Sequence, residues 1–260
     1  MSAGAATPKR AAPELPILVR KARAWFASFA VPAAPALALL PDPSLRLVRY
    51  LPGQTALVVT VFEHLDTSIG PYHEVAIGFP VRHNKSTAVP LLPLLAGRWL
   101  EDLGPWMYVV AVDTEAAGGA MKRHWGAPTF LAKIDIDTSP GRMRCRVTEA
   151  GRPILAVDIT RPSPTSERFH FPLRLWSKLD DELLYTSLDV DAVGCTRRLG
   201  AKGELTFEDH GRVAALAALD VAKAKCIDVR WFDEYRTALD RPRARFRVGA
   251  RARASALEPS

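Results

Sequence analysis

The sequence has few cysteines and lacks the short motifs of the common nucleotide and hydrolase sites. Cys145, Cys195 and Cys226 are about fifty and about thirty residues apart, which fits neither a disulfide framework nor a Cys-x-x-Cys metal or redox site. No Gly-x-Ser-x-Gly sequence is present, and Gly118-Gly119 lacks the third glycine of a dinucleotide fingerprint. We therefore expect free thiols, no bound cofactor and a cytoplasmic location.

Long apolar runs are also missing. The longest, at residues 33–40 and 55–62, are far shorter than the roughly 18–20 residues that a membrane-spanning helix requires. The N-terminal segment carries a basic pair, Lys9 and Arg10, but no apolar stretch of the signal-peptide type precedes Pro13. The sequence thus predicts neither a membrane segment nor secretion.

Basic charge is concentrated at one end of the chain. Residues 241–260 hold six arginines against Glu258, a local charge of +5 out of a net +7, so the rest of the chain carries only +2. A body so nearly balanced does not favour specific nucleic-acid binding. We predict a solvated tail at 241–260, with nonspecific contact to anions, acidic partners or RNA as the alternative. Residues 1–16, rich in Ala and Pro, are predicted to be disordered.

Short segments of β type fill the chain between these ends. They are rich in Val, Ile and aromatic residues and are divided by Pro, Gly and polar turns. Strands are predicted at residues 25–31, 45–50, 55–62, 72–81, 106–112, 132–137, 142–148, 153–160, 169–175, 182–190, 195–199 and 203–207, with 221–230 as a further candidate. Helices are predicted at 33–40, 113–124 and 232–238.

These elements predict one β-rich α+β domain. No internal repeat and no domain boundary interrupts residues 17–240. Many short strands with few helices are typical of a closed sheet. We therefore expect a single closed or conical antiparallel β-barrel over 17–240, with a few peripheral helices.

Three segments carry a resemblance to a known family. Residues 66–78 read DTSIGPYHEVAIG and include Glu74, residues 113–131 read DTEAAGGAMKRHWGAPTFL and include Pro128, and Arg23 lies in ARAWF. They resemble the glutamate-bearing strand, the active-site segment and an arginine before an aromatic pair in the acetoacetate decarboxylase-like superfamily. The resemblance implies a β-barrel with outer helices and an apolar pocket for small keto acids, and it implies a homo-oligomer.

The same resemblance assigns roles, and one of them has no matching side chain. It implies that Arg23 holds the substrate carboxylate and that Glu74 moves protons, while a lysine after the proline forms a Schiff base with the ketone. That position is Thr129, which has no amine. The family's Gly-Arg-Glu and its second glutamate also fall on different residue types: Met121, Lys122, Arg123 and Thr60.

Each candidate has a structural alternative. Glu74 also fits an outward strand position paired with an arginine, and Arg23 also fits a surface basic cluster with Arg20. Lys122 and Lys133 are the amines nearest the motif, and Lys133 shares a strand face with Thr129, although a Schiff-base lysine must be desolvated. Three histidines near acidic residues show no recognised ligand spacing, so no metal site is predicted: His64, His73 and His124.

The sequence therefore predicts an acetoacetate decarboxylase-like enzyme without Schiff-base chemistry. Its substrate is expected to be a small keto acid or a polyketide-like carbonyl compound, and acid/base catalysis would serve isomerisation, dehydration, cyclisation or hydrolysis. Two alternatives stay open: a noncatalytic small-molecule-binding protein, and a decarboxylase with a relocated lysine. The candidate catalytic residues are Glu74, Arg23, Thr129 and Lys133.

Overall fold

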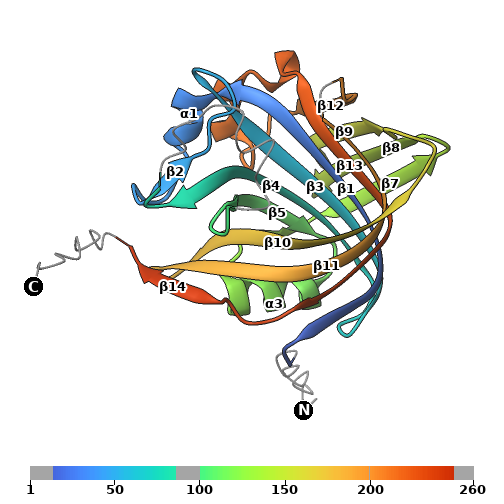
Figure 1. Ribbon diagram of the computed structural model, residues 1–260, viewed down its shortest axis with the longest axis horizontal. Helices are drawn as coiled ribbons and strands as arrows, with labels where there is room; N and C mark the ends of the chain where they lie inside the picture. Colours follow the sequence, from blue (N-terminus) through green and yellow to red (C-terminus); the bar gives the residue numbers. More distant parts are fainter. Residues whose placement is uncertain (1–13, 86–99, 199, 249–260) are drawn as a thin grey trace, which may run out of the picture.

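The computed structural model describes residues 14–85, 100–198 and 200–248. Within these ranges seven strands close into a barrel (Figure 1). Their order around the barrel is β4 (Tyr72–His83), β3 (Gln54–Thr67), β1 (Ile17–Pro32), β13 (Cys226–Leu239), β11 (Glu182–Arg198), β10 (Glu167–Leu179) and β5 (Gly104–Val112), with β5 pairing back to β4. The predicted closed, β-rich barrel is confirmed.

The barrel is mixed rather than purely antiparallel. Strands β10 and β5 run parallel and are joined through the pair Trp176 and Trp106, whereas the other barrel neighbours are antiparallel. Three short strands extend it: β2 (Leu45–Leu47) on β4, β6 (Thr129–Leu131) on β5, and β14 (Ala244–Arg247) on β11. Strands β5 and β10 can run parallel because no hairpin joins them. The chain leaves the barrel after β5 and returns only at β10.

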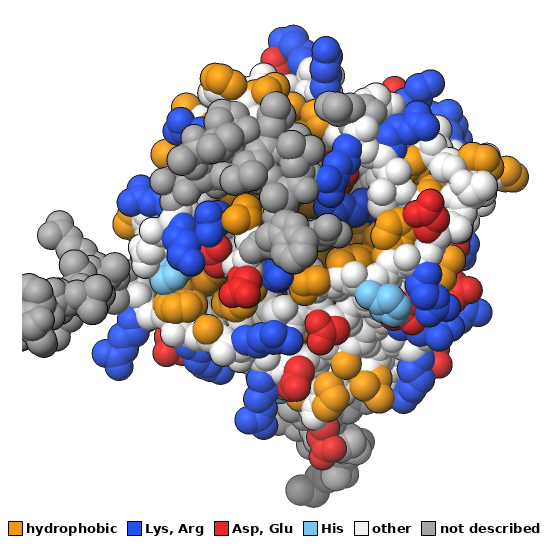
Figure 2. All heavy atoms as spheres, viewed as in Figure 1, with side chains coloured by type: hydrophobic (Ala, Val, Ile, Leu, Met, Phe, Trp, Pro, Cys, Tyr) orange, Lys and Arg blue, Asp and Glu red, His pale blue; other side chains and the backbone are white. Residues whose placement is uncertain are grey.

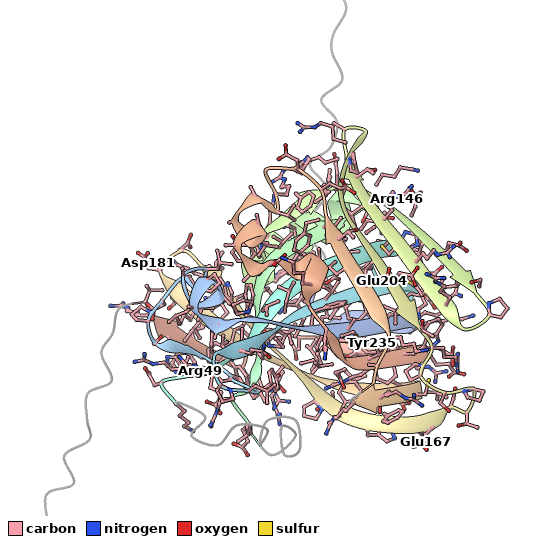
Figure 3. The ribbon with its side chains drawn as sticks, turned by 90° about the horizontal axis from the view of Figure 1, so that it is seen from above. Arg49, Arg146, Glu167, Asp181, Glu204 and Tyr235 are labelled. Carbon is pink, nitrogen blue, oxygen red and sulfur yellow. The ribbon has the colours of Figure 1, made fainter. Side chains whose placement is uncertain are left out.

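Between those strands the chain builds a second, four-stranded antiparallel sheet. Its order is β12 (Gly203–Phe207), β9 (Arg152–Thr160), β8 (Arg142–Glu149) and β7 (Lys133–Ser139). Seen from above, this sheet lies beside the barrel and is marked by Arg146 on β8 and Glu204 on β12 (Figure 3). The sheet gives the barrel wall an apolar surface to pack against.

Barrel strands β1, β3 and β4 are apolar on both faces, and each face has a different use. Successive side chains on a strand point to opposite faces. On β1, Trp25 and Phe29 join a large core that also contains Met143 and Val157 of the second sheet. Phe26, on the opposite face, lines the inside of the barrel. The main core therefore lies between the barrel and the second sheet, which leaves the barrel interior free for a cavity.

Four short helices complete the part of the fold that the structure describes: α1 (Ala33–Leu37), α3 (Glu115–Trp125) and the 3-10 helices at Ala214–Leu219 and Val221–Lys223. The predicted helices at 33–40 and 113–124 are confirmed. Thr114 caps α3 by accepting a hydrogen bond from the Ala117 amide, and Gly126 ends it in the left-handed conformation. Helix α3 packs against β5, β6 and β10 (Figure 1). No described helix is long and apolar enough to cross a membrane.

Two predictions near the C-terminal end of the fold are wrong. Residues 232–238 form part of strand β13 rather than a helix, and residues 182–190 and 195–199 belong mostly to one strand, β11. The pairing of β11 with β13 shifts register between Val193 and Gly194. Such an irregularity breaks the two-residue period, and buried Trp231, Phe232 and Tyr235 then imitate helical spacing.

The tail and the terminal segment are only partly described. Of the tail predicted at 241–260, β14 brings Arg245 within 3.0 Å of Glu182, and residues 249–260 lie outside the described residues, as do 1–13 and 86–99. On the face of the molecule shown in Figure 2, basic and acidic side chains are mixed with one another. Exposed pairs of this kind contribute about 0–1 kcal/mol each.

The three cysteines are free. We expect the most buried of them, Cys145, to make the protein less stable at alkaline pH. Burial in the core raises the pKa of the Cys145 thiol from 9.0 to about 12. The unfolded chain therefore loses this proton first, so the thiol's stabilising contribution is intact below about pH 9 and is lost as the pH rises toward 12. Between about pH 8 and 10 the free energy of unfolding should fall by about 1.4 kcal/mol more in the wild type than in Cys145→Val. Urea unfolding at both pH values measures this, and equal losses in the two proteins would contradict it.

Candidate active site

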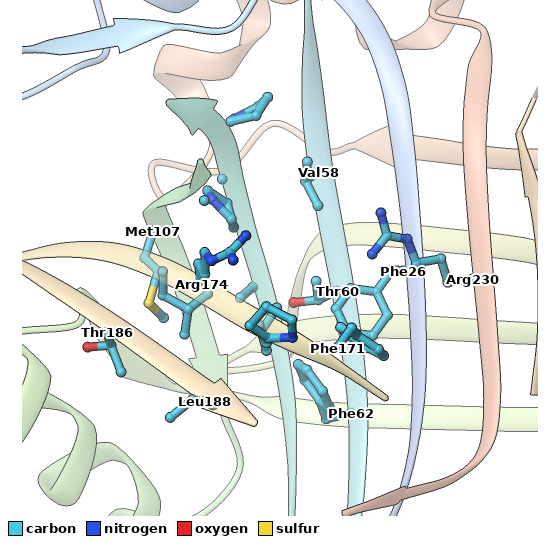
Figure 4. A pocket seen from close by; sticks show the side chains of 18 of the residues that line it. Phe26, Val58, Thr60, Phe62, Met107, Phe171, Arg174, Thr186, Leu188 and Arg230 are labelled. Carbon is cyan, nitrogen blue, oxygen red and sulfur yellow. The ribbon is translucent and has the colours of Figure 1, made fainter. Parts of the chain in front are cut away.

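The inside of the barrel holds a cavity of about 460 Å³. Inward-facing side chains of the barrel strands line it, together with the end of α3. Most of the lining is apolar or aromatic, and a few polar and charged groups project into it. Pockets of roughly 300–1,000 Å³ with this composition are typical of small-molecule sites. Figure 4 shows part of the wall, with Phe62, Phe171 and Met107 around the space.

A carboxylate and an imidazole meet at the buried end of this cavity. Glu74 on β4 is 6% exposed and His64 on β3 is 5% exposed, and Glu74 Oε2 lies 3.6 Å from His64 Nε2. The β3–β4 register pairs Phe62 with Glu74 and His64 with Tyr72, so the two functional side chains are diagonal neighbours on one face. Neither ring nitrogen of His64 has a hydrogen-bond partner among the described residues.

Aromatic rings hold the imidazole in place. His64 is stacked between Phe62, at 5.3 Å between ring centroids, and Tyr72, at 4.2 Å. Burial and the nearby Glu74 carboxylate raise the pKa of the Tyr72 hydroxyl well above its usual value, and the same causes raise the pKa of Tyr235. Both phenols are therefore neutral at physiological pH.

Arginines supply positive charge on the cavity wall. Arg174 on β10 and Arg230 on β13 both line the cavity, and both guanidinium groups are directed into it (Figure 4). The Arg230 Nε donates to Asp228 at 3.2 Å, and Arg174 Nη1 donates to the Leu100 carbonyl at 3.3 Å. Burial and the Asp228 charge raise the pKa of Tyr50, another lining residue, to about 12. Guanidinium groups in such a setting suit the carboxylate of a bound anion.

The structure brings only one of the predicted catalytic residues to this cavity. Glu74 lines it, whereas Arg23 lies on the outer face of β1. There the Arg23 Nε is 2.6 Å from Glu63, and its Nη1 donates to Thr138 of the second sheet at 3.3 Å. Arg23 is thus separated from Glu74 by the barrel wall.

Thr129 and the two lysines also lie elsewhere. Thr129 is the first residue of β6 and is buried against α3, where its hydroxyl donates to the Gly118 carbonyl at 3.1 Å. Lys133 is exposed and lies 2.7 Å from Asp135, and Lys122 is exposed on α3. None of the described residues that line the cavity is a lysine.

The histidines considered for a metal site are dispersed. His73 neighbours Glu74 on β4 but faces outward, where its Nδ1 lies 2.6 Å from Asp113, and His124 packs against Trp125. Among the described residues no three His, Cys, Asp or Glu side chains converge on a point where a metal ion could be held. The charged and titratable side chains of the cavity include Glu74, His64, Arg174 and Arg230.

The sequence analysis did not single out Arg174 and Arg230, and it considered His64 only for a metal site and not as a neighbour of Glu74. His64 could have been found, because the hairpin loop at 66–71 sets the register that places it diagonal to Glu74. Arg174 and Arg230 could not, because they meet the site only when β10 and β13 close the barrel.

Comparison with known proteins identifies the family to which this closed mixed barrel belongs. A family model described as acetoacetate decarboxylase (ADC) matches residues 4–241. The chain belongs to the acetoacetate decarboxylase family. No curated protein matches the sequence.

Solved structures share the fold at low identity. An acetoacetate decarboxylase from Legionella pneumophila is 17% identical over 94% of both chains, with a TM-score of 0.65. The enduracididine biosynthesis enzyme MppR, complexed with a condensation product of pyruvate and imidazole 4-carboxaldehyde, is 16% identical over 91% of this chain and 96% of its own, with a TM-score of 0.60. An acetoacetate decarboxylase-like enzyme from Sphingomonas wittichii is 12% identical over 94% and 99%, with a TM-score of 0.51. These likenesses show the fold.

Proposed function

We propose that this protein is an enzyme that converts a keto acid by acid/base catalysis inside the barrel, without a Schiff base. The observation that carries the proposal is the buried pair of Glu74 and His64 in a largely apolar cavity inside the barrel. A carboxylate in such surroundings is held away from water and close to a bound substrate, as a general base must be. Membership of a family that acts on small carbonyl compounds is consistent with this chemistry.

The arrangement supports enolisation as the common first step. A keto acid would place its carboxylate at Arg174 and Arg230, with the carbon next to its ketone beside Glu74. Glu74 would take a proton from that carbon, the electron pair of the C–H bond would form the enolate, and His64 would donate a hydrogen bond to the enolate oxygen. Isomerisation, dehydration and cyclisation all proceed from an enolate.

The positions of the lysines support a reaction in which the ketone forms no covalent bond to a lysine. A Schiff base requires a neutral amine within the site, and none of the described cavity-lining residues is a lysine. The carboxylate-holding role implied for Arg23 falls in this proposal to Arg174 and Arg230. Lys133 and Thr129 have no part in it.

Proton exchange tests the proposal without knowledge of the natural product. In deuterium oxide, the protein should exchange the protons next to the ketone of pyruvate or phenylpyruvate at least tenfold faster than the spontaneous rate, because enolisation is reversible. Proton NMR follows the loss of signal. Tight binding of keto acids without any accelerated exchange would contradict the catalytic proposal and favour a noncatalytic binding protein.

A further inference from the structure

The cavity extends well beyond the space that a short keto acid fills. Its volume of about 460 Å³ falls within the range of pockets that enclose most of a drug-sized ligand. Thr186 and Leu188 lie on one side of it, while Phe26 and Arg230 lie on the other (Figure 4). A ligand whose carboxylate is near Arg230 therefore needs a further group to reach the Thr186 side.

That far side is an apolar lobe suited to a ring. Met107 on β5 packs with Met121 and Trp125 of α3 in one buried cluster, and all three line the cavity. Leu175, which is packed against this cluster, is the strand partner of Thr186. Methionine and tryptophan side chains make favourable contacts with aromatic rings. The lobe therefore favours an aromatic substituent over a second charged group.

One polar atom in this lobe has no protein partner. Thr186 is 3% exposed and lines the cavity, yet its Oγ1 is buried without a hydrogen bond among the described residues. A buried hydroxyl left in that condition destabilises the unliganded protein. A ligand oxygen at this point would form the missing bond and remove the cost, so the position is suited to discriminating between ligands.

We propose that Thr186 is a specificity-determining residue that hydrogen-bonds an oxygen at the far end of an aromatic keto acid. The ring occupies the lobe of Met107, Met121 and Trp125, and the carboxylate is held near Arg230 at the opposite side. The inference rests on the proposed function for the orientation of the substrate. The substrate class is then keto acids with an aryl group that bears a hydroxyl or carbonyl oxygen.

Three keto acids, added from fresh solutions, separate these contributions: pyruvate, phenylpyruvate and para-hydroxyphenylpyruvate. Dissociation constants from isothermal titration should fall at least tenfold when the ring is added, because the ring buries apolar area. The ring hydroxyl should lower the constant a further five- to tenfold in the wild type. Thr186→Val keeps the side-chain shape and should abolish only the second gain.

Thr60→Val is the matched control, because Thr60 lines the opposite wall (Figure 4) and the variant should keep both gains. Thr186→Ser retains a hydroxyl and should keep the preference, which covers a failure of the valine variant to fold. A wild type with no hydroxyl gain, a Thr186→Val variant that keeps the gain, or its loss in Thr60→Val would each overturn the inference. Binding is measured separately from proton exchange, so this preference without any exchange would refute the proposed catalysis alone.

Discussion

Replacing Glu74 by glutamine is expected to slow keto-acid proton exchange by about 10²–10⁴-fold. Glutamine has the shape of glutamate and can still lie beside His64, but it cannot accept the substrate proton. The dissociation constant for phenylpyruvate should change less than about threefold, because the arginines and the aromatic wall that bind it are intact. Exchange rates from proton NMR and affinities from titration check the two halves of this expectation.

Glu63→Gln is a control with the same chemical change. Glu63 lies one position away from Phe62 on β3, so it faces out of the barrel, where it pairs with Arg23. This variant should exchange keto-acid protons at the wild-type rate. An exchange rate in Glu74→Gln close to that of the wild type would remove Glu74 from the chemistry. Equal losses in both variants would indicate a general disturbance of the barrel.

Replacing Trp25 by alanine should cost about 3–5 kcal/mol of the free energy of unfolding, the largest effect on stability that we expect from these substitutions. Trp25 is 1% exposed, makes an edge-to-face contact with Trp231 at 5.8 Å, and lies in the core between the barrel and the second sheet. Its removal leaves a cavity that neighbouring strands cannot fill. Urea unfolding measures the loss.

Phe171→Ala is the matched truncation on the other side of the wall. Phe171 is half-buried and lines the barrel cavity (Figure 4), so its removal enlarges an existing space and should cost roughly 1–2 kcal/mol. Equal losses of stability in the two variants would contradict the view that the packed core lies outside the barrel and an open site lies inside it.

The sequence was sufficient to predict the barrel, but it was insufficient to predict which side chains line its interior. Strands rich in Val, Ile and aromatics, and the capped helix predicted at 113–124, are local features and are confirmed, the helix as Glu115–Trp125. Which face of a strand turns inward depends on closure, and a shift of one position reverses it. Arg23 illustrates this, because its neighbours Ala22 and Ala24 occupy the other face and Arg23 itself meets Glu63 outside the cavity.

Pairing between strands that are distant in the sequence also determined structure that the sequence alone did not predict. The segment at 232–238 has helical apolar spacing by itself, and it becomes a strand because β1 and β11 pair with it on both sides. The same strand carries Arg230 to the wall of the cavity. Glu74 was found through family resemblance, while its partner His64 required the hairpin register. Residues joined across distant strands leave no mark in the local sequence.

The most direct test of the account observes the bound ketone itself. Phenylpyruvate labelled with carbon-13 at the ketone carbon is added to the wild-type protein, and the carbon resonance of the complex is recorded. We predict a bound signal in the ketone region that shifts when Glu74 is replaced by glutamine. A signal in the imine region, which would mean that a lysine has combined with the ketone, would contradict the account.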